Sequence, residues 1–130
     1  MKFEKLIIVG SFLILFFSNF TQSARHIKND IIEVYFSNKL DISDLSKIKA
    51  DLVKESILLN YDYLKFTTEG KLSAIEYHVK AKKFGGSDKT DDTNKEIGFI
   101  VNFAPNAKYG IIIGEKDTIK KRKEVLENQK

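Results

Sequence analysis

The chain has no cysteine and no tryptophan, only one proline, and only two histidines among its 130 residues. Without cysteine it can form no disulfide, offers no thiol nucleophile or thiolate metal ligand, and cannot carry the cysteine-linked lipid of a bacterial lipoprotein. An ordinary hydrophobic core must therefore hold the folded domain together.

The N-terminus carries the clearest pattern, a charged start followed by an apolar run over residues 6–17. A membrane-spanning helix needs about 20 apolar residues, whereas a secretory signal peptide uses about 7–15. Small residues at Thr21 and Ser23 favour cleavage before Ala24. We therefore predict a signal peptide over residues 1–23 and an exported chain, either periplasmic or secreted.

The alternative at the N-terminus is an uncleaved anchor, which would leave the domain tethered to the membrane. The apolar run is short for this role, and the positive cluster of a stop-transfer segment does not follow it. Only in this alternative would the membrane be a partner of the chain.

The rest of the chain predicts one small domain over residues 30–115 and a basic C-terminal tail over residues 116–130. The whole chain has a formal net charge of +4 and a pI of about 9.1. The basic excess is concentrated in the tail, which makes it weak support for nucleic-acid binding, and we expect no nucleic-acid partner.

Two periodicities predict the elements of the domain. Alternating apolar residues predict strands over residues 32–36, 57–63, 72–81 and 97–103. Residues 111–113 form either a short fifth strand or a segment that closes the core. Residues 41–56 have helical spacing, with Leu45, Ile48 and Leu52 on one face and Asp41 or Ser43 as the cap. A glycine-bearing turn over residues 67–71 predicts a hairpin, and residues 85–92 predict a polar loop.

The resulting fold class is α+β. We expect a single helix packed on a four- to five-stranded, mostly antiparallel sheet in the order β-α-β-β-β(-β), followed by a frayed C-terminal helix. The last segment is expected to fray and to be dispensable for folding, because Ile119, Val125 and Leu126 form a poor apolar stripe.

Residues 40–52, 57–61 and 69–75 form a short series of motifs: a capped helix, a strand and a glycine-bearing hairpin. In these motifs the chain resembles small exported strand-helix-strand-strand domains of Bacteroidota-like bacteria, which occur as stand-alone proteins and in the tails of BlaR1-like membrane peptidases. The resemblance implies a fold and a compartment. It carries over no catalytic residue, because the zinc-binding His-Glu-x-x-His motif of those peptidases is missing here.

Few residues suggest chemistry. His78 lies on the polar phase of a strand, where a solvated imidazole is the favoured interpretation over a metal ligand or general base. Asp88, Asp91 and Asp92 invite a calcium site but lack the register of an EF-hand, so a solvated loop is favoured. We expect no catalytic residue, no metal and no cofactor.

Two groups of residues are candidates for a binding surface, namely strand tyrosines and a basic run. The competing interpretations are tyrosines packed at a sheet edge and a solvated terminus. The candidates are Tyr61, Tyr63, Tyr77, Tyr109, Lys120, Lys121, Arg122 and Lys123.

Two functional hypotheses follow. In the first, the chain is an exported non-catalytic domain that binds an envelope or secreted protein, or another cell-envelope component, through a sheet edge or aromatic face. In the second, it is a small periplasmic enzyme or hydrolase inhibitor that uses His78 and nearby carboxylates. A concave pocket holding His78 beside a carboxylate would favour the second hypothesis, and a flat aromatic face or free edge strand the first.

Overall fold

The computed structural model describes residues 25–28 and 30–129, so the predicted signal peptide and its cleavage point lie outside the described residues. No helix within this part of the chain is long and apolar enough to cross a membrane. The elements are β1 (Arg25–Lys28), β2 (Ile31–Phe36), α1 (Ile42–Lys54), β3 (Ile57–Phe66), β4 (Leu72–Ala81), β5 (Phe84–Thr90), β6 (Ile97–Asn102), β7 (Ile111–Glu115) and α2 (Lys116–Glu127).

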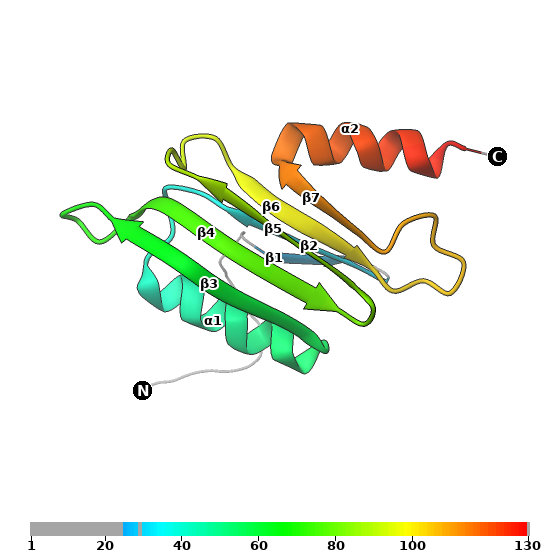
Figure 1. The fold of residues 1–130 in the computed structure, drawn as a ribbon, viewed down its shortest axis with the longest axis horizontal. Coiled ribbons are helices and arrows are strands. Elements are labelled where there is room, and N and C mark those ends of the chain that lie inside the picture. The colour runs from blue at the N-terminus through cyan, green and yellow to red at the C-terminus, as the bar shows by residue number, and fades with distance from the viewer. Residues whose placement is uncertain (1–24, 29, 130) are drawn as a thin grey trace.

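The α+β class is confirmed, but the expectation of one sheet is wrong. The strands form two antiparallel sheets, one in the order β1-β2-β6-β7 and the other in the order β3-β4-β5 (Figure 1). The additional strand β5 occupies most of the segment expected to be a polar loop. Its exposed, glycine-rich sequence lacks an alternating pattern, yet its backbone pairs with β4 along seven residues.

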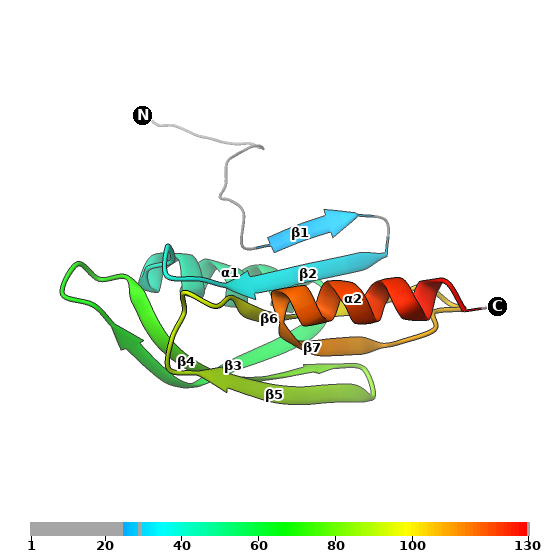
Figure 2. The ribbon, with the colours of Figure 1, turned by 90° about the horizontal axis from the view of Figure 1, so that it is seen from above.

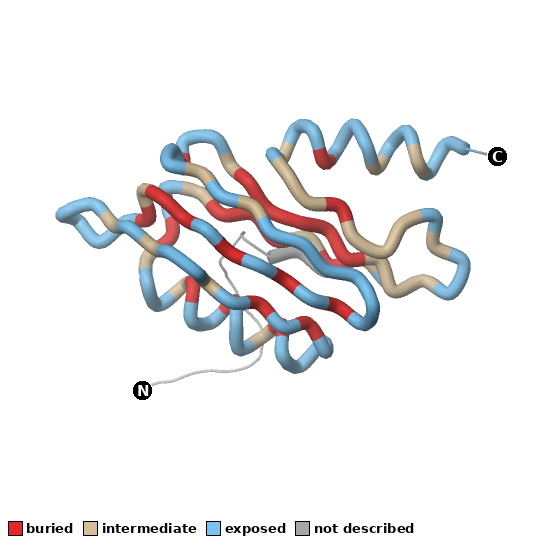
Figure 3. Tube along the Cα trace, in the orientation of Figure 1, coloured by how far each residue is buried: buried red, intermediate tan, exposed pale blue. Residues whose placement is uncertain are grey.

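The main core lies between the two sheets and α1. Inward-facing side chains of β2, β4 and β6 meet there, with Phe36 at the centre and ring centroids of Tyr77 and Phe99 at 5.0 and 6.5 Å from it. From α1, the expected residues Leu45, Ile48 and Leu52 are buried in this core. The alternation of buried and exposed residues along β4 is visible in Figure 3.

Local sequence defines both ends of α1. The Asp41 carboxylate accepts a hydrogen bond from the backbone N–H of Asp44, and the Asp44 carboxylate accepts one from that of Asp41, which completes a capping box. At the C-terminal end, Ser56 adopts a left-handed backbone with φ of 63° and turns the chain into β3.

A second, smaller core lies on the opposite face of the four-stranded sheet, under α2 (Figure 2). It consists of Tyr35, Ile100, Ile112 and Ile119, and Ile119 is fully buried. The terminal helix is therefore docked rather than frayed, which corrects the expectation for the C-terminal segment. One well-placed isoleucine covers apolar side chains that would otherwise face water.

The two sheets approach each other at β5 and β7. A side chain at Gly86 of β5 would collide with Ile113 of β7, because an added Cβ would come within 2.5 Å of the isoleucine Cδ1. The absence of a side chain at this position thus lets the two edge strands pack together.

Candidate functional site

The four candidate tyrosines do not share one surface. Tyr77 is fully buried and donates a hydrogen bond of 2.9 Å to the carbonyl of Gly98. Tyr61 is half-buried against the main core and donates to the carbonyl of Leu45 at 2.7 Å. Tyr109 packs against the second core, and only Tyr63 is largely exposed.

Burial also governs the acidity of Tyr61, Tyr77 and Tyr109. It raises the pKa of Tyr61 and Tyr77 above the ordinary value, with the charge of Asp88 adding to the effect at Tyr77. Burial, together with the neighbouring Glu127, raises the pKa of Tyr109 to about 12. These rings therefore serve mainly as packing elements with anchored hydroxyl groups.

The basic candidates lie along α2. Lys120, Lys121 and Arg122 are exposed, whereas Lys123 is half-buried and its ammonium lies 3.8 Å from the Glu33 carboxylate of β2. Lys123 therefore contributes to docking of the helix, and the other three remain on its solvent-facing side.

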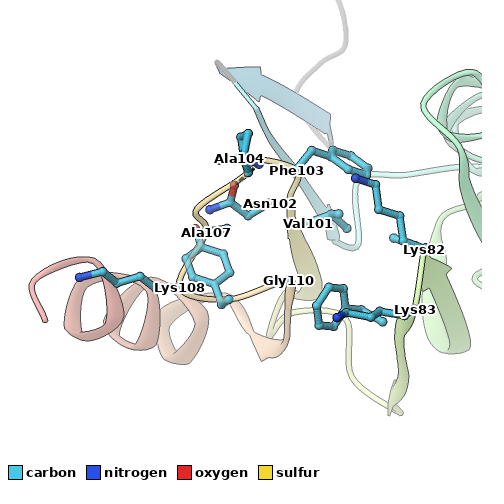
Figure 4. A pocket seen from close by; sticks show the side chains of 13 residues that line it. Lys82, Lys83, Val101, Asn102, Phe103, Ala104, Ala107, Lys108 and Gly110 are labelled. Carbon is cyan, nitrogen blue, oxygen red and sulfur yellow. Dashed lines mark hydrogen bonds between the residues drawn. The ribbon is translucent and has the colours of Figure 1, made fainter.

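Aromatic and basic side chains converge in a cleft that the sequence did not indicate. We call it the hairpin cleft. It has a volume of about 460 Å³ and lies between the β4–β5 turn and the loop of residues 103–110 that joins β6 to β7 (Figure 4). This volume is within the range of small-molecule sites, roughly 300–1,000 Å³.

Two consecutive lysines form the β4–β5 turn and border the cleft. The Lys82 ammonium lies 5.3 Å from the centre of the Phe103 ring, and the Lys83 ammonium lies 5.6 Å from that of Phe84. Each pair has cation–π geometry, which is worth about 0.5–1 kcal/mol at exposed sites. The rings hold the ammonium groups near the cleft without neutralising their charge.

The backbone of this turn is unusual. Lys82 has a φ of 57°, a left-handed conformation that glycine or asparagine would adopt more readily. In the other hairpin, between β3 and β4, the residue with positive φ is Gly70 at 82°. The β4–β5 turn instead places a long cationic side chain at its strained position.

Phe84 and Gly110 line the cleft and contact each other. The Phe84 ring is 39 % exposed although it is a large apolar side chain. It packs on the backbone of Gly110, where an added Cβ would come within 2.3 Å of the ring. Glycine thus permits close contact between the first residue of β5 and the loop that leads into β7.

The lining of the hairpin cleft contains lysines but no acidic residue. Lys108 also belongs to the lining, but its ammonium is bonded to the backbone carbonyl of Gln129 and extends toward α2, as Figure 4 shows. Among the described residues, neither Lys82 nor Lys83 forms an ion pair. Their two charges are therefore available to an anionic ligand.

His78 has a carboxylate neighbour, but it does not line the hairpin cleft. Its Nδ1 lies 2.9 Å from the Asp62 carboxylate, and its Nε2 lies 3.3 Å from the Asn60 amide nitrogen. The side chains of His78 and Asp62 are 51 % and 39 % exposed, so water screens the pair. The structure thus supplies a histidine–carboxylate pair on an open sheet face.

The three aspartates of the expected acidic loop are separated by the end of β5. Asp88 belongs to this strand, whereas Asp91 and Asp92 follow it. The Asp92 carboxylate accepts a hydrogen bond from the backbone of Asn94 and so shapes the turn. Within the described residues, no group of three or more histidine or acidic side chains is arranged to hold a metal ion.

Lys82, Lys83, Phe84 and Phe103 were missed as site residues. The available signal was the Lys-Lys-Phe sequence immediately after a strongly alternating strand, which places two cations at a turn. In comparisons with protein families, curated proteins and solved structures, no family model, protein or structure matches this chain.

Proposed function

We propose that the chain is an exported, non-catalytic domain that binds a protein or another component of the cell envelope through the hairpin cleft. The observation that carries this proposal is the convergence of Phe84, Phe103 and two lysines on one concave site. Within the described residues, neither lysine forms an ion pair. Aromatic side chains with a polar or charged companion are typical of recognition surfaces. Export rests on the signal-peptide pattern of residues 1–23.

Recognition through an edge of the three-stranded sheet has less support than recognition through the cleft. The edge of β5 lies against β7, since Gly86 contacts Ile113, so there is little room for an added strand. The pairing of β3 with β4 is irregular at Tyr61/Tyr63 and again at Lys65/Phe66. Bulges of this kind protect an edge strand against pairing with another chain.

The second candidate function is a small periplasmic enzyme or hydrolase inhibitor. It is favoured by the His78–Asp62 pair, because a carboxylate can orient an imidazole that acts as a general base. Its weakness is the open surroundings, which neither exclude water nor supply a neighbouring nucleophile in the observed contacts. His78→Ala should therefore leave binding to envelope components unchanged.

Co-sedimentation with an isolated envelope fraction tests the proposed function. The mature chain should sediment with the envelope, and Phe84→Ala should weaken this binding. Leu58→Ala is the matched control, because Leu58 is a large exposed apolar residue of β3 outside the cleft. Equal binding by both variants would refute the cleft as the site, and absence of binding by the wild-type chain would refute the binding function.

Intact-mass measurement tests export separately. Protein made in a secreting bacterial host should begin at Ala24 or Arg25. A mature protein that retains Met1 would instead support the anchored alternative.

A further inference from the structure

We infer that the ligand of the hairpin cleft is a small organic anion, in which one phosphate or carboxylate group is joined to an apolar part. This inference rests on the proposed binding function and narrows it to a ligand class. The cleft offers both halves of the required chemistry, with ammonium groups of Lys82 and Lys83 beside the rings of Phe103 and Phe84.

Charge complementarity determines the sign of the ligand's charge. The lining contains no carboxylate, and the ammonium groups of Lys82 and Lys83 have no acidic partner within the described residues. An anion beside either ammonium group would gain an attractive interaction in a partly enclosed site, where screening by water is weaker than on an open surface. A cationic ligand would meet only repulsion from the same groups.

Apolar surface determines the rest of the ligand. The lining of the cleft includes the buried residues Ala81 and Val101 and the exposed Phe84. An inorganic anion would leave this apolar surface in water. An anion that carries an aromatic or aliphatic group would cover it and gain the corresponding hydrophobic free energy.

The backbone of Lys82 supports a role for this residue beyond the turn itself. A left-handed conformation at a non-glycine residue is unfavourable, and glycine would relieve it. The turn nevertheless has a lysine there, with its ammonium directed over Phe103 at the cleft (Figure 4). We expect Lys82→Gly to raise the melting temperature and to weaken ligand binding, which are opposite effects that a purely structural residue would not produce.

Chemical-shift titration of the mature chain with four matched probes tests the inference. Phenyl phosphate carries both the anion and the ring, inorganic phosphate only the anion, benzyl alcohol only the ring, and benzylamine a ring with a positive charge. Phenyl phosphate should bind most tightly, with shifts concentrated at Phe84, Phe103 and Gly110. Binding of benzylamine as tight as that of phenyl phosphate would overturn the inference.

Variants that remove the lysine charges provide the second part of the experiment. Lys82→Gln and Lys83→Gln keep the length of the side chain, and together they should weaken phenyl phosphate binding by about tenfold or more. Lys80→Gln is the control, because Lys80 is exposed on the same hairpin but does not line the cleft. Equal affinity of the double variant and the control would overturn the inference.

Two further outcomes separate a lipid headgroup from a small free anion, and failure of the ligand inference from failure of the proposed binding function. If the chain bound vesicles of phosphatidylglycerol in a lysine-dependent manner but did not bind phenyl phosphate, the small-anion inference would be wrong and a lipid surface would replace it. If envelope binding depended on Phe84 but not on Lys82 and Lys83, the proposed function would stand and the anionic ligand would be rejected.

Discussion

The two helices of this domain are similar in length but differ in what specifies them. Helix α1 has a complete capping box and three buried residues, Leu45, Ile48 and Leu52. Helix α2 begins at Lys116, its N-cap residue Glu115 makes no side-chain cap, and its one buried residue is Ile119. The first helix is therefore encoded by its own sequence, whereas the second depends on the surface it covers.

A tyrosine hydroxyl donates a hydrogen bond to each helix from another part of the fold. The two hydrogen bonds differ in burial, as the two helices do. Tyr61 is half-buried and donates to the Leu45 carbonyl of α1 at 2.7 Å. Tyr109 donates to the Glu127 carboxylate of α2 at 3.2 Å in an exposed setting. Buried hydrogen bonds are less exposed to competition from water, so the connection to α1 should be the stronger one.

The largest effect is expected at the buried face of α1. Leu52→Asp should unfold the domain, because it places an unpaired carboxylate at a fully buried position and should cost more than about 4 kcal/mol. Val53→Asp is the control, since Val53 is 56 % exposed one residue further along. Circular dichroism melts that showed the reverse order would contradict the assignment of the buried face.

The next effect is expected at the single anchor of α2. Ile119→Ala should lower the free energy of unfolding by about 2–3 kcal/mol, because it leaves a gap between Ile100 and Ile112. Val125→Ala should change it by less than about 0.5 kcal/mol, since this side chain is 60 % exposed. Thermal melts and hydrogen exchange of β7 amides measure the difference.

Deletion of residues 118–130 sharpens the same test. The sequence alone predicted that this segment is dispensable for folding, whereas its docking on the second core predicts a loss at least as large as that of Ile119→Ala. A truncated chain with an unchanged melting temperature would mean that the docking of α2 contributes no stability.

The sequence predicted those elements whose own residues carry the full pattern of a helix or a strand. The capped, amphipathic α1 and the alternating strand β4 were recovered with their buried residues. The alternating pattern predicted one buried face for strand β6. However, its residues 97–101 are all apolar or glycine, on both faces of the strand. The structure buries Ile97 through Val101 without interruption, because α2 covers the second face (Figure 3). A continuous apolar run of this kind is itself a signal for a strand that is covered on both faces.

Strand β5 and the hairpin cleft could not be predicted in this way. The sequence of β5 has two glycines and few apolar side chains, so only its pairing with β4 makes it a strand. The cleft combines the β4–β5 turn with a loop about twenty residues later, and this proximity depends on the packing of the two sheets. Tyr77, a candidate for binding, instead became a core residue because its strand phase faces inward.

Alkaline pH should weaken both tyrosine connections. Burial raises the pKa of Tyr61, and burial with Glu127 raises that of Tyr109 to about 12, relative to about 10 in the unfolded chain. The resulting stabilisation is fully present below pH 10 and is lost as the pH rises toward the folded values. The melting temperature should therefore fall as the pH rises from about 10 toward 12, and it should fall less in Tyr61→Phe than in the wild-type chain.

The smallest effect is expected at the helix caps. Asp41→Ala should lower the melting temperature by a few degrees, because it removes the hydrogen bond to the Asp44 backbone. The same hydrogen bond lowers the pKa of the Asp41 carboxyl, so its stabilisation exists above the unfolded pKa and disappears as the pH falls through the folded one. The difference between variant and wild type should thus shrink as the pH falls below the unfolded pKa of about 4.

Glu115→Asp is the reciprocal change at the start of α2. Glu115 has the extended backbone of a capping residue but makes no side-chain cap, and the shorter aspartate is a preferred cap. We expect this variant to raise the melting temperature slightly and to slow hydrogen exchange in the first turn of α2. If Glu115→Asp had no effect while Asp41→Ala destabilised the domain, the start of α2 would be fixed by the burial of Ile119 alone. The two helices would then differ in kind, one defined by its cap and its core face and the other only by its docking.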